Sequence, residues 1–281
     1  MKVYNYISML LLVGTAIFVS CSQDEEMSGE NMDSLQSFQI SVLDGGFQDM
    51  DANKTRATES DYSTKFVEGD AIGVFAVRNE AIVGEINNRK FTMQDGIWTL
   101  DDGGDEIEYK GSEFQRMNFY AYYPVGTATR YTAVELPDIS GQDATKTLTT
   151  LKEEKDFMRG AAVVTKGNIA ASLQMFRVFT IINFKIKLKL NAFTSNAATL
   201  SEIKLISTGS LPLVNPTTND KATVDLSNGQ ITCTTGLTSP TFRPASGIAL
   251  STTEVSIPVK IYAHRSTIQV QFTIDGKTST T

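Results

Sequence analysis

The sequence predicts an all-β protein made of two sandwich domains, for three reasons. Apolar and polar residues alternate in several segments, as they do in strands with one buried and one solvated face. Asp-Gly and Asn-Gly pairs lie between such segments, where hairpins turn. Beyond the first 20 residues no stretch keeps a helical period over ten residues, and the remainder of the 281-residue chain is long enough for two domains.

The alternating segments are the expected strands. The clearest covers residues 182–190, where one face is apolar and the other carries three lysines. Residues 37–42 and 268–274 alternate in the same way. Residues 72–77 are apolar on both faces, which favours a central strand between two layers.

Proline and glycine mark edges and turns. Residues 255–261 alternate, but Pro258 has no amide donor, so this strand is expected at a sheet edge. Asp95-Gly96 and Asn228-Gly229 each predict a two-residue hairpin, because these residues tolerate the positive φ of such turns. Asp275-Gly276 predicts another turn, but no apolar return strand follows it.

The N-terminal segment indicates export. Residues 7–19 are mostly apolar, follow Lys2 and precede Ser20 and Cys21. A spanning helix needs about 20 apolar residues, so this shorter segment fits a cleavable signal. We interpret residues 1–20 as a lipoprotein signal peptide and Cys21 as the acylated first residue of the mature chain, held on a membrane by roughly 0.8 kcal/mol per buried CH₂. The alternative is a secretory signal with an incidental Cys21.

Two polar stretches flank the first expected strand. Residues 22–36 are acidic and too poor in apolar side chains to fold alone, so they are interpreted as a tether. Residues 49–60 form a polar loop with a single arginine, Arg56. Such a loop is a natural protease site.

Composition excludes several functions. The formal net charge of −7 argues against a nucleic-acid partner. The one histidine, His264, is accompanied by no catalytic or metal-binding motif, so neither an enzyme nor a cofactor is predicted. If Cys21 is acylated, Cys233 is left alone, and it is expected to be a buried free thiol.

Several motifs follow Cys21 in a characteristic order. They are Lys54-Thr-Arg-Ala-Thr58, Phe66-Val-Glu-Gly-Asp-Ala-Ile-Gly-Val-Phe75, the hairpin with Trp98, Asn118-Phe-Tyr-Ala-Tyr-Tyr-Pro124, Asp156-Phe-Met158 and Phe176-Arg-Val-Phe179. Together they resemble the fimbrillin family, the Mfa-like type V pilins and pilus-associated surface lipoproteins. The resemblance covers residues 1–190 by motif. Arg177 departs from it, since many relatives carry His there, and this position is interpreted as structural.

The resemblance implies a fold and an assembly mechanism. The fold is a pair of transthyretin-like Greek-key β-sandwiches, exported as a lipoprotein to the outer face of the cell outer membrane; the acidic run 24–26 behind Cys21 resembles the address for that surface. An arginine-specific surface protease would cut the bond Arg56-Ala57. Pilus subunits would then associate by strand exchange, with the lipid on Cys21 as the membrane partner. The exchanged strand is the one that carries the following apolar residues: Phe38, Ile40 and Val42.

The expected organisation has four parts. They are a signal peptide (1–20), a tether and prosegment with the first strand (21–56), an N-terminal sandwich (57–190) and a C-terminal sandwich (191–281) that is expected either to be truncated or to lack a strand.

Other interpretations of the same residues stay open. The strand 37–42 could be permanent, and Arg56 could be an ordinary loop cation. The aromatic run 119–123 could stack on sugars, which would make the protein a surface glycan- or ligand-binding lipoprotein, although core and rim positions are commoner. The acidic residues of 101–106 could hold calcium, although a solvated turn fits their spacing better.

Overall fold

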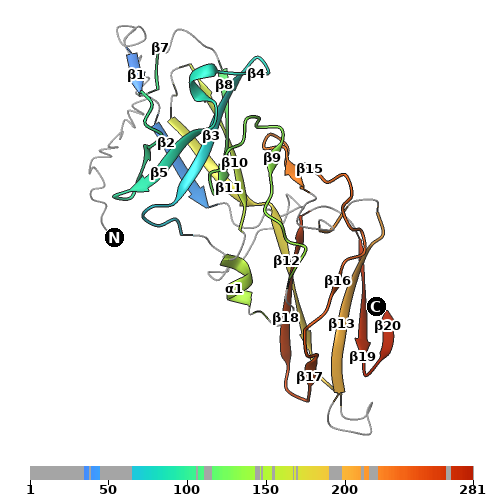
Figure 1. Cartoon of the computed structure of the whole chain (residues 1–281). Coiled ribbons are helices and arrows are strands. Elements are labelled where there is room, and N and C mark those ends of the chain that lie inside the picture. The colour runs from blue at the N-terminus through green and yellow to red at the C-terminus, as the bar shows by residue number, and fades with distance from the viewer. Residues whose placement is uncertain are drawn as a thin grey trace, which may run out of the picture.

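The protein is all-β, as predicted, with two lobes in the computed structural model (Figure 1). The structure describes residues 35–37, 39–44, 65–105, 107–110, 116–142, 146, 148–153, 156–166, 168, 170–189, 198–209, 212–214, 221–263 and 267–280. In this part of the chain the α-helical segment is α1 (Leu148–Glu153), which contacts β18 (Val255–Tyr262). Its six residues are too few for a helical period to stand out in the sequence.

The upper lobe contains one eight-stranded sheet. Its strands lie side by side in the order β2 (Gln39–Asp44), β11 (Ala170–Arg177), β10 (Met158–Thr165), β8 (Arg116–Tyr123), β3 (Ala71–Arg78), β5 (Arg89–Gln94) and β6 (Ile97–Leu100), and β4 (Ala81–Ile82) pairs with β3. The end strands β2 and β6 contact each other, so the sheet curls around its core. Every strand of the ordered run from β2 to β6 contributes a buried apolar side chain to that core.

The central position predicted for residues 72–77 is confirmed in β3. Ile72, Val74 and Ala76 are fully buried inside the curled sheet. Phe75 points to the opposite face and is also fully buried, in the second hydrophobic core that continues into the lower lobe. Strand β3 therefore serves two cores at once, which explains why its sequence is apolar throughout.

Two of the sequence motifs contact each other across β3 and β8. Gly73 pairs with Tyr122, and a side chain on Gly73 would place its Cβ 2.5 Å from the Tyr122 ring. The freed space lets the Tyr122 hydroxyl donate to Asn88 Oδ1 (3.0 Å) and accept from Gly126 N (2.9 Å). Next to it, the Tyr123 hydroxyl donates to Asp70 Oδ1 (2.8 Å). The glycine and aspartate of one motif thus fit the tyrosines of the other.

The lower lobe is a sandwich of two sheets. One pairs β12 (Phe179–Ile186) with β18 along the whole length of β12. The other has the order β16 (Thr241–Phe242), β13 (Ala198–Ser207), β19 (Ile268–Ile274) and β20 (Lys277–Thr280), with β17 (Ile248–Leu250) also on β13. The Phe184 and Phe272 rings meet edge to face between them, with centroids 5.5 Å apart. A small third sheet contains β15 (Ile231–Thr232), β14 (Thr223–Val224) and β9 (Val134–Glu135).

The edge position predicted from Pro258 is confirmed, because β18 is one of only two strands in its sheet. The side chain of Gln142 covers part of its free edge. Gln142 Oε1 accepts from Lys260 N (2.6 Å), and Gln142 Nε2 donates to Lys260 O (2.5 Å). This side-chain amide takes the place of a neighbouring strand, which is one way to protect an edge from unwanted pairing.

The hairpin predictions have different outcomes. Asp95-Gly96 and Asp275-Gly276 are two-residue turns with positive φ at both positions, between β5 and β6 and between β19 and β20. No apolar return strand follows Asp275-Gly276, but the polar residues of β20 form a return strand that pairs with β19. Asn228-Gly229 lies in a hairpin, but Val224 pairs with Ile231, so the connection is longer than two residues. The Asp225 carboxylate shapes it by accepting from Ser227 N (2.8 Å).

The lobes are joined by more than the chain. Phe75 of β3 lies in the same hydrophobic core as Leu205 of β13, and Arg159 of β10 donates from Nη1 to Leu226 O (3.0 Å), two residues beyond β14 of the small third sheet. By strand pairing, β12 belongs to the lower lobe although it precedes residue 190. Whether the parts 57–190 and 191–281 fold as separate units stays a prediction.

Candidate functional site

The edge strand β2 is the candidate site. It comes from the segment predicted as the first strand, and it pairs with β11 in parallel, from Gln39 opposite Ala170 to Asp44 opposite Met175. The other strands of the curled sheet are joined by antiparallel pairing. Strand β2 is therefore a parallel strand at one end of an otherwise antiparallel sheet.

The side chains of β2 alternate as the sequence predicts. Ile40 is buried, Val42 is half-buried, and Gln39, Ser41 and Leu43 are exposed. Ile40 packs in the upper core with three fully buried side chains of β11: Ala171, Leu173 and Met175. Of the three residues predicted to fill the groove, the structure brings Ile40 and Val42 to it, whereas Phe38 lies outside the described residues.

On its other side, β2 contacts β6 and closes the curl of the sheet. Trp98 of β6 is buried in the upper core. The Phe66 ring lies edge to face with both Trp98 (5.4 Å) and Tyr123 (5.5 Å). Burial, and secondarily the hydrogen bond to Asp70, raises the pKa of Tyr123 to about 12. Strand β2 thus fills a slot whose walls are β11 and β6.

A half-buried ion pair lies at the C-terminal end of β11. Arg177 Nε donates to Asp156 Oδ2 (3.2 Å), and the two side chains are 8% and 14% exposed. Asp156 Oδ1 also accepts from Phe157 N (3.0 Å). The structural role inferred for Arg177 agrees with this geometry, which fixes the start of β10 against the end of β11.

A second pairing holds the segment just before β2. Strand β1 (Leu35–Ser37) pairs antiparallel with β7 (Glu108–Lys110), and this two-stranded ribbon is separate from the curled sheet. Figure 1 shows it at the top of the upper lobe. Sequence reasoning missed both strands, because three residues are too short to display alternation.

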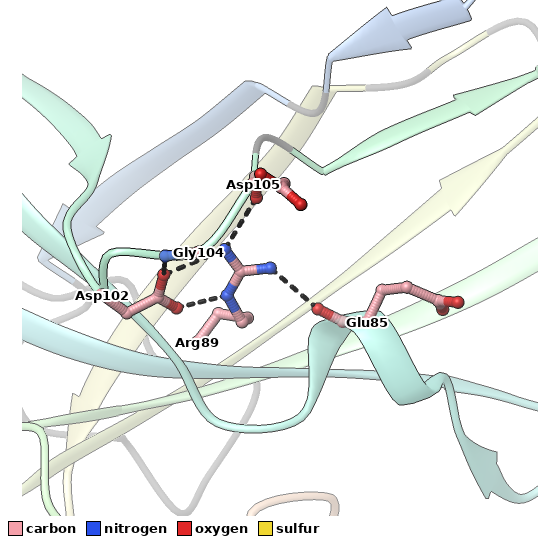
Figure 2. A network of polar contacts seen from close by, with 5 residues as sticks. All are labelled: Glu85, Arg89, Asp102, Gly104 and Asp105. Carbon is pink, nitrogen blue, oxygen red and sulfur yellow. Dashed lines mark hydrogen bonds and ion pairs between the residues drawn. The ribbon is translucent and has the colours of Figure 1, made fainter.

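The loop before β7 is organised by Arg89 (Figure 2). Its guanidinium forms an ion pair with Asp102 and donates to Glu85 O (3.0 Å) and Asp105 O (2.9 Å). Gly104 N donates to Asp102 Oδ1 (2.9 Å), and a Cβ on Gly104 would lie 2.7 Å from Arg89 Nη2. The hydrogen bond from Arg89 lowers the pKa of Asp102 below its ordinary value.

Two carboxylates of the acidic loop are paired with basic side chains of β5. Asp102 binds Arg89, and Asp101 binds Lys90 (2.9 Å). No group of three histidine, cysteine or acidic residues that could hold a metal ion is present in the described ranges. The solvated-turn interpretation stays a prediction, because Glu106 lies outside the described residues.

The other residues singled out in the sequence are partly described by the structure and partly outside it. The aromatic run has the predicted core-and-rim arrangement, with Phe119 and Tyr122 buried and Tyr120 and Tyr123 half-buried. Cys233 is a free thiol that is half-buried rather than buried. The proposed lipid site and cleavage site, together with the histidine, lie outside the described residues: Cys21, Arg56, Ala57 and His264. In the part of the chain that the structure describes, no helix is both long and apolar enough to cross a membrane.

Comparison with known proteins places the chain in a family. The model of the fimbrillin-like family matches residues 55–281. The chain belongs to the fimbrillin-like family. The resemblance seen in the sequence motifs is thereby confirmed.

Individual proteins are also similar to this chain. The chain is 35% identical over 125 residues to a Bacteroides ovatus protein provisionally named fimbrium tip subunit Fim1C; the match covers 44% of this chain and 22% of that protein. The chain thus spans less than a quarter of the length of this curated relative. A crystal structure of a provisionally assigned cell adhesion protein from Bacteroides ovatus matches with TM-score 0.50 and 14% identity, covering 88% of this chain and 86% of the other. A similar protein from Bacteroides uniformis gives TM-score 0.47 and 22% identity, covering 76% and 78%.

Proposed function

We propose that this protein is a structural or accessory subunit of a cell-surface fimbria that assembles by strand exchange. Its lipidated Cys21 anchors the precursor on the outer membrane. An arginine-specific protease cuts between Arg56 and Ala57, which frees β2 and its lipid from the covalent body. An incoming strand from another pilus subunit then takes the place of β2. The role is mechanical, with no catalytic step.

The single observation that carries the proposal is the position of β2. It is an edge strand, it pairs in parallel on β11, and Ile40 anchors it in the upper core. The segment from 45 to 64, which contains Arg56, connects it to the body. The family match begins at residue 55, so β2 precedes the part of the chain that the family model covers.

Loss of β2 would leave a surface that favours association. The edge of β11 would present unpaired main-chain donors and acceptors, which pair readily with another strand. The place of Ile40 would expose apolar surface of Ala171, Leu173 and Met175. Refilling one buried isoleucine position is worth about 1.5 to 3 kcal/mol, and the main-chain hydrogen bonds add to it.

Protease treatment of residues 22–281 tests the proposal. The cut protein is sequenced from its new N-terminus and sized by chromatography with light scattering. A start at Ala57 accompanied by dimers or longer assemblies supports a subunit of the fimbrial body. An Arg56→Gln variant is the matched control and should stay uncut at this position and monomeric. Resistance of Arg56 while other arginines are cut contradicts the exchange mechanism and favours an anchor or accessory role with a permanent β2.

Export is tested separately in cells. Cys21→Ser should abolish acylation and release the protein from the membrane fraction, and whole-cell protease shaving should no longer remove it. A variant that fractionates and is shaved like the natural protein contradicts the lipoprotein assignment.

A further inference from the structure

The segment that carries β2 is held at two places, and the second one is separate from the curled sheet. Residues 35–37 pair antiparallel with β7, and residues 39–44 pair parallel with β11. Two strands that are close in the sequence, β1 and β2, therefore pair with two strands that belong to different sheets. We call β7 and β11 together the receptor. The chain that occupies the receptor must run antiparallel to β7 and parallel to β11, so the receptor sets both the length and the direction of its occupant.

Strand β7, the partner of β1, has few contacts that hold it in place within the described residues. Strand β7 pairs with β1, and no other strand in the described ranges pairs with it. Ile107, just before it, is buried in the upper core and fixes its start. Within the described residues, further support comes from the loop 101–105, which Arg89 clamps to β5 and to the 3₁₀ turn η2 (Gly84–Ile86).

Arg89 is suited to hold a strand in place. Its side chain is 16% exposed and binds both a carboxylate and two main-chain carbonyls, so it fixes backbone as well as a side chain. A guanidinium presents such donors in a rigid planar fork, which positions a loop more tightly than a lysine does. Lys90, the next residue, contacts the same loop through Asp101, but the two side chains are 40% and 45% exposed, where such a pair contributes little.

We propose that β7, presented by the Arg89–Asp102 clamp, is a second strand-binding site, and that the complete receptor takes an extended segment of about ten residues, antiparallel on β7 and then parallel on β11. In the precursor the occupant is the chain's own segment, residues 35–44. After processing it is a strand of another fimbrial subunit that supplies the same features: antiparallel main-chain pairing with β7, and apolar side chains at the two positions now held by Ile40 and Val42. The second occupant, a strand of another subunit, rests on the proposed function. Binding of the chain's own segment to β7 does not depend on it.

Retention of the cut segment tests the second site. A cleavage site for a sequence-specific protease replaces residues 51–56 in the protein of residues 22–281, and a fluorophore at residue 23 reports dissociation of the N-terminal piece. Gln36→Pro disturbs the β1 ladder and leaves β2 unchanged, because proline cannot donate to a ladder. Arg89→Met removes the clamp, and Lys90→Met is its matched control.

The inference predicts that Gln36→Pro and Arg89→Met each speed dissociation at least about tenfold, the effect of losing little more than one net hydrogen bond. Lys90→Met should dissociate at the rate of the natural sequence. Equal rates for Gln36→Pro and the natural sequence would overturn the inference, even if Arg89→Met fails to fold. Slow release without any later assembly would contradict the proposed function and leave the second site standing.

Discussion

Ile40 lies directly opposite Ala171 in the parallel pair of β2 and β11, and both side chains are buried in the upper core. This pair is one of six register pairs that join β2, a segment before residue 45, to β11. The proposed cleavage site lies between Ile40 and Ala171 in the sequence. After cleavage, only non-covalent contacts such as this pair would hold β2 on the protein, and their strength decides whether β2 can be exchanged.

Ile40→Ala should destabilise the intact protein by about 2 to 4 kcal/mol, because it removes buried methyl and methylene groups and leaves a cavity. Leu43→Ala, on the same strand but 56% exposed, is the control and should change stability by less than about 0.5 kcal/mol. Urea unfolding monitored by the fluorescence of the single tryptophan, Trp98, measures both. Similar values for the two variants would mean that Ile40 does not anchor β2.

Arg177→Met should destabilise the fold by about 1 to 3 kcal/mol, because it leaves the half-buried Asp156 carboxylate without its hydrogen-bonded cation. Lys185→Met breaks an exposed pair with Glu254 (3.8 Å) and should cost less than about 1 kcal/mol. The free energy of unfolding of each variant, measured in urea, makes the comparison. A small effect of Arg177→Met would contradict the assignment of this pair to the structural frame of β10 and β11.

Tyr123 should make the protein sensitive to alkali. Its pKa is raised to about 12 in the folded state, mainly by burial and then by the hydrogen bond to Asp70, against about 10 in the unfolded chain. The folded state therefore keeps this proton more tightly, so the stabilisation is present below pH 10 and is lost as the pH rises through 12. Tyr123→Phe should remove this part of the pH dependence. Absorbance titration of tyrosinate should show one late-ionising group fewer in the variant, and an unchanged curve would contradict the assignment.

A nick between the proposed domains should not separate them. Strand β12 lies before residue 190 and pairs with β18 over its whole length, while Arg159 and Leu226 join the lobes elsewhere. A protease site introduced within 191–197 should yield two pieces on a denaturing gel that migrate together in native size-exclusion chromatography. Separation of the pieces under native conditions would mean that 57–190 and 191–281 are independent units.

Much of the fold could be predicted because its signals are local. Alternation marked β2, β12 and β19, and the Asp-Gly turns marked two hairpins at their correct residues. What sequence reasoning missed depends on contacts between distant segments. The polar strand β20 exists because it pairs with β19, although its own residues give no apolar pattern.

Only part of the candidate site could be predicted from the sequence. Ile40 and Val42 were visible from alternation, but their parallel partner β11 was not, since register depends on which strand comes alongside. Arg89 and Asp102 are 13 residues apart and belong to different elements. Nothing in the spacing of the acidic loop indicates that a single arginine on β5 organises it.

A reversible lock on β2 is the most direct test of the account. Ser41 and Ser172 are register partners on the exposed face of β2 and β11, so Ser41→Cys with Ser172→Cys should form a disulfide between neighbouring strands. Residues 22–281 with these changes and Cys233→Ser are cut at Arg56, oxidised or reduced, and sized by light scattering. Exchange of β2 predicts that the oxidised cut protein stays monomeric and that reduction releases it into dimers or longer assemblies. Equal assembly with β2 locked and unlocked would contradict the central claim that an incoming strand replaces β2.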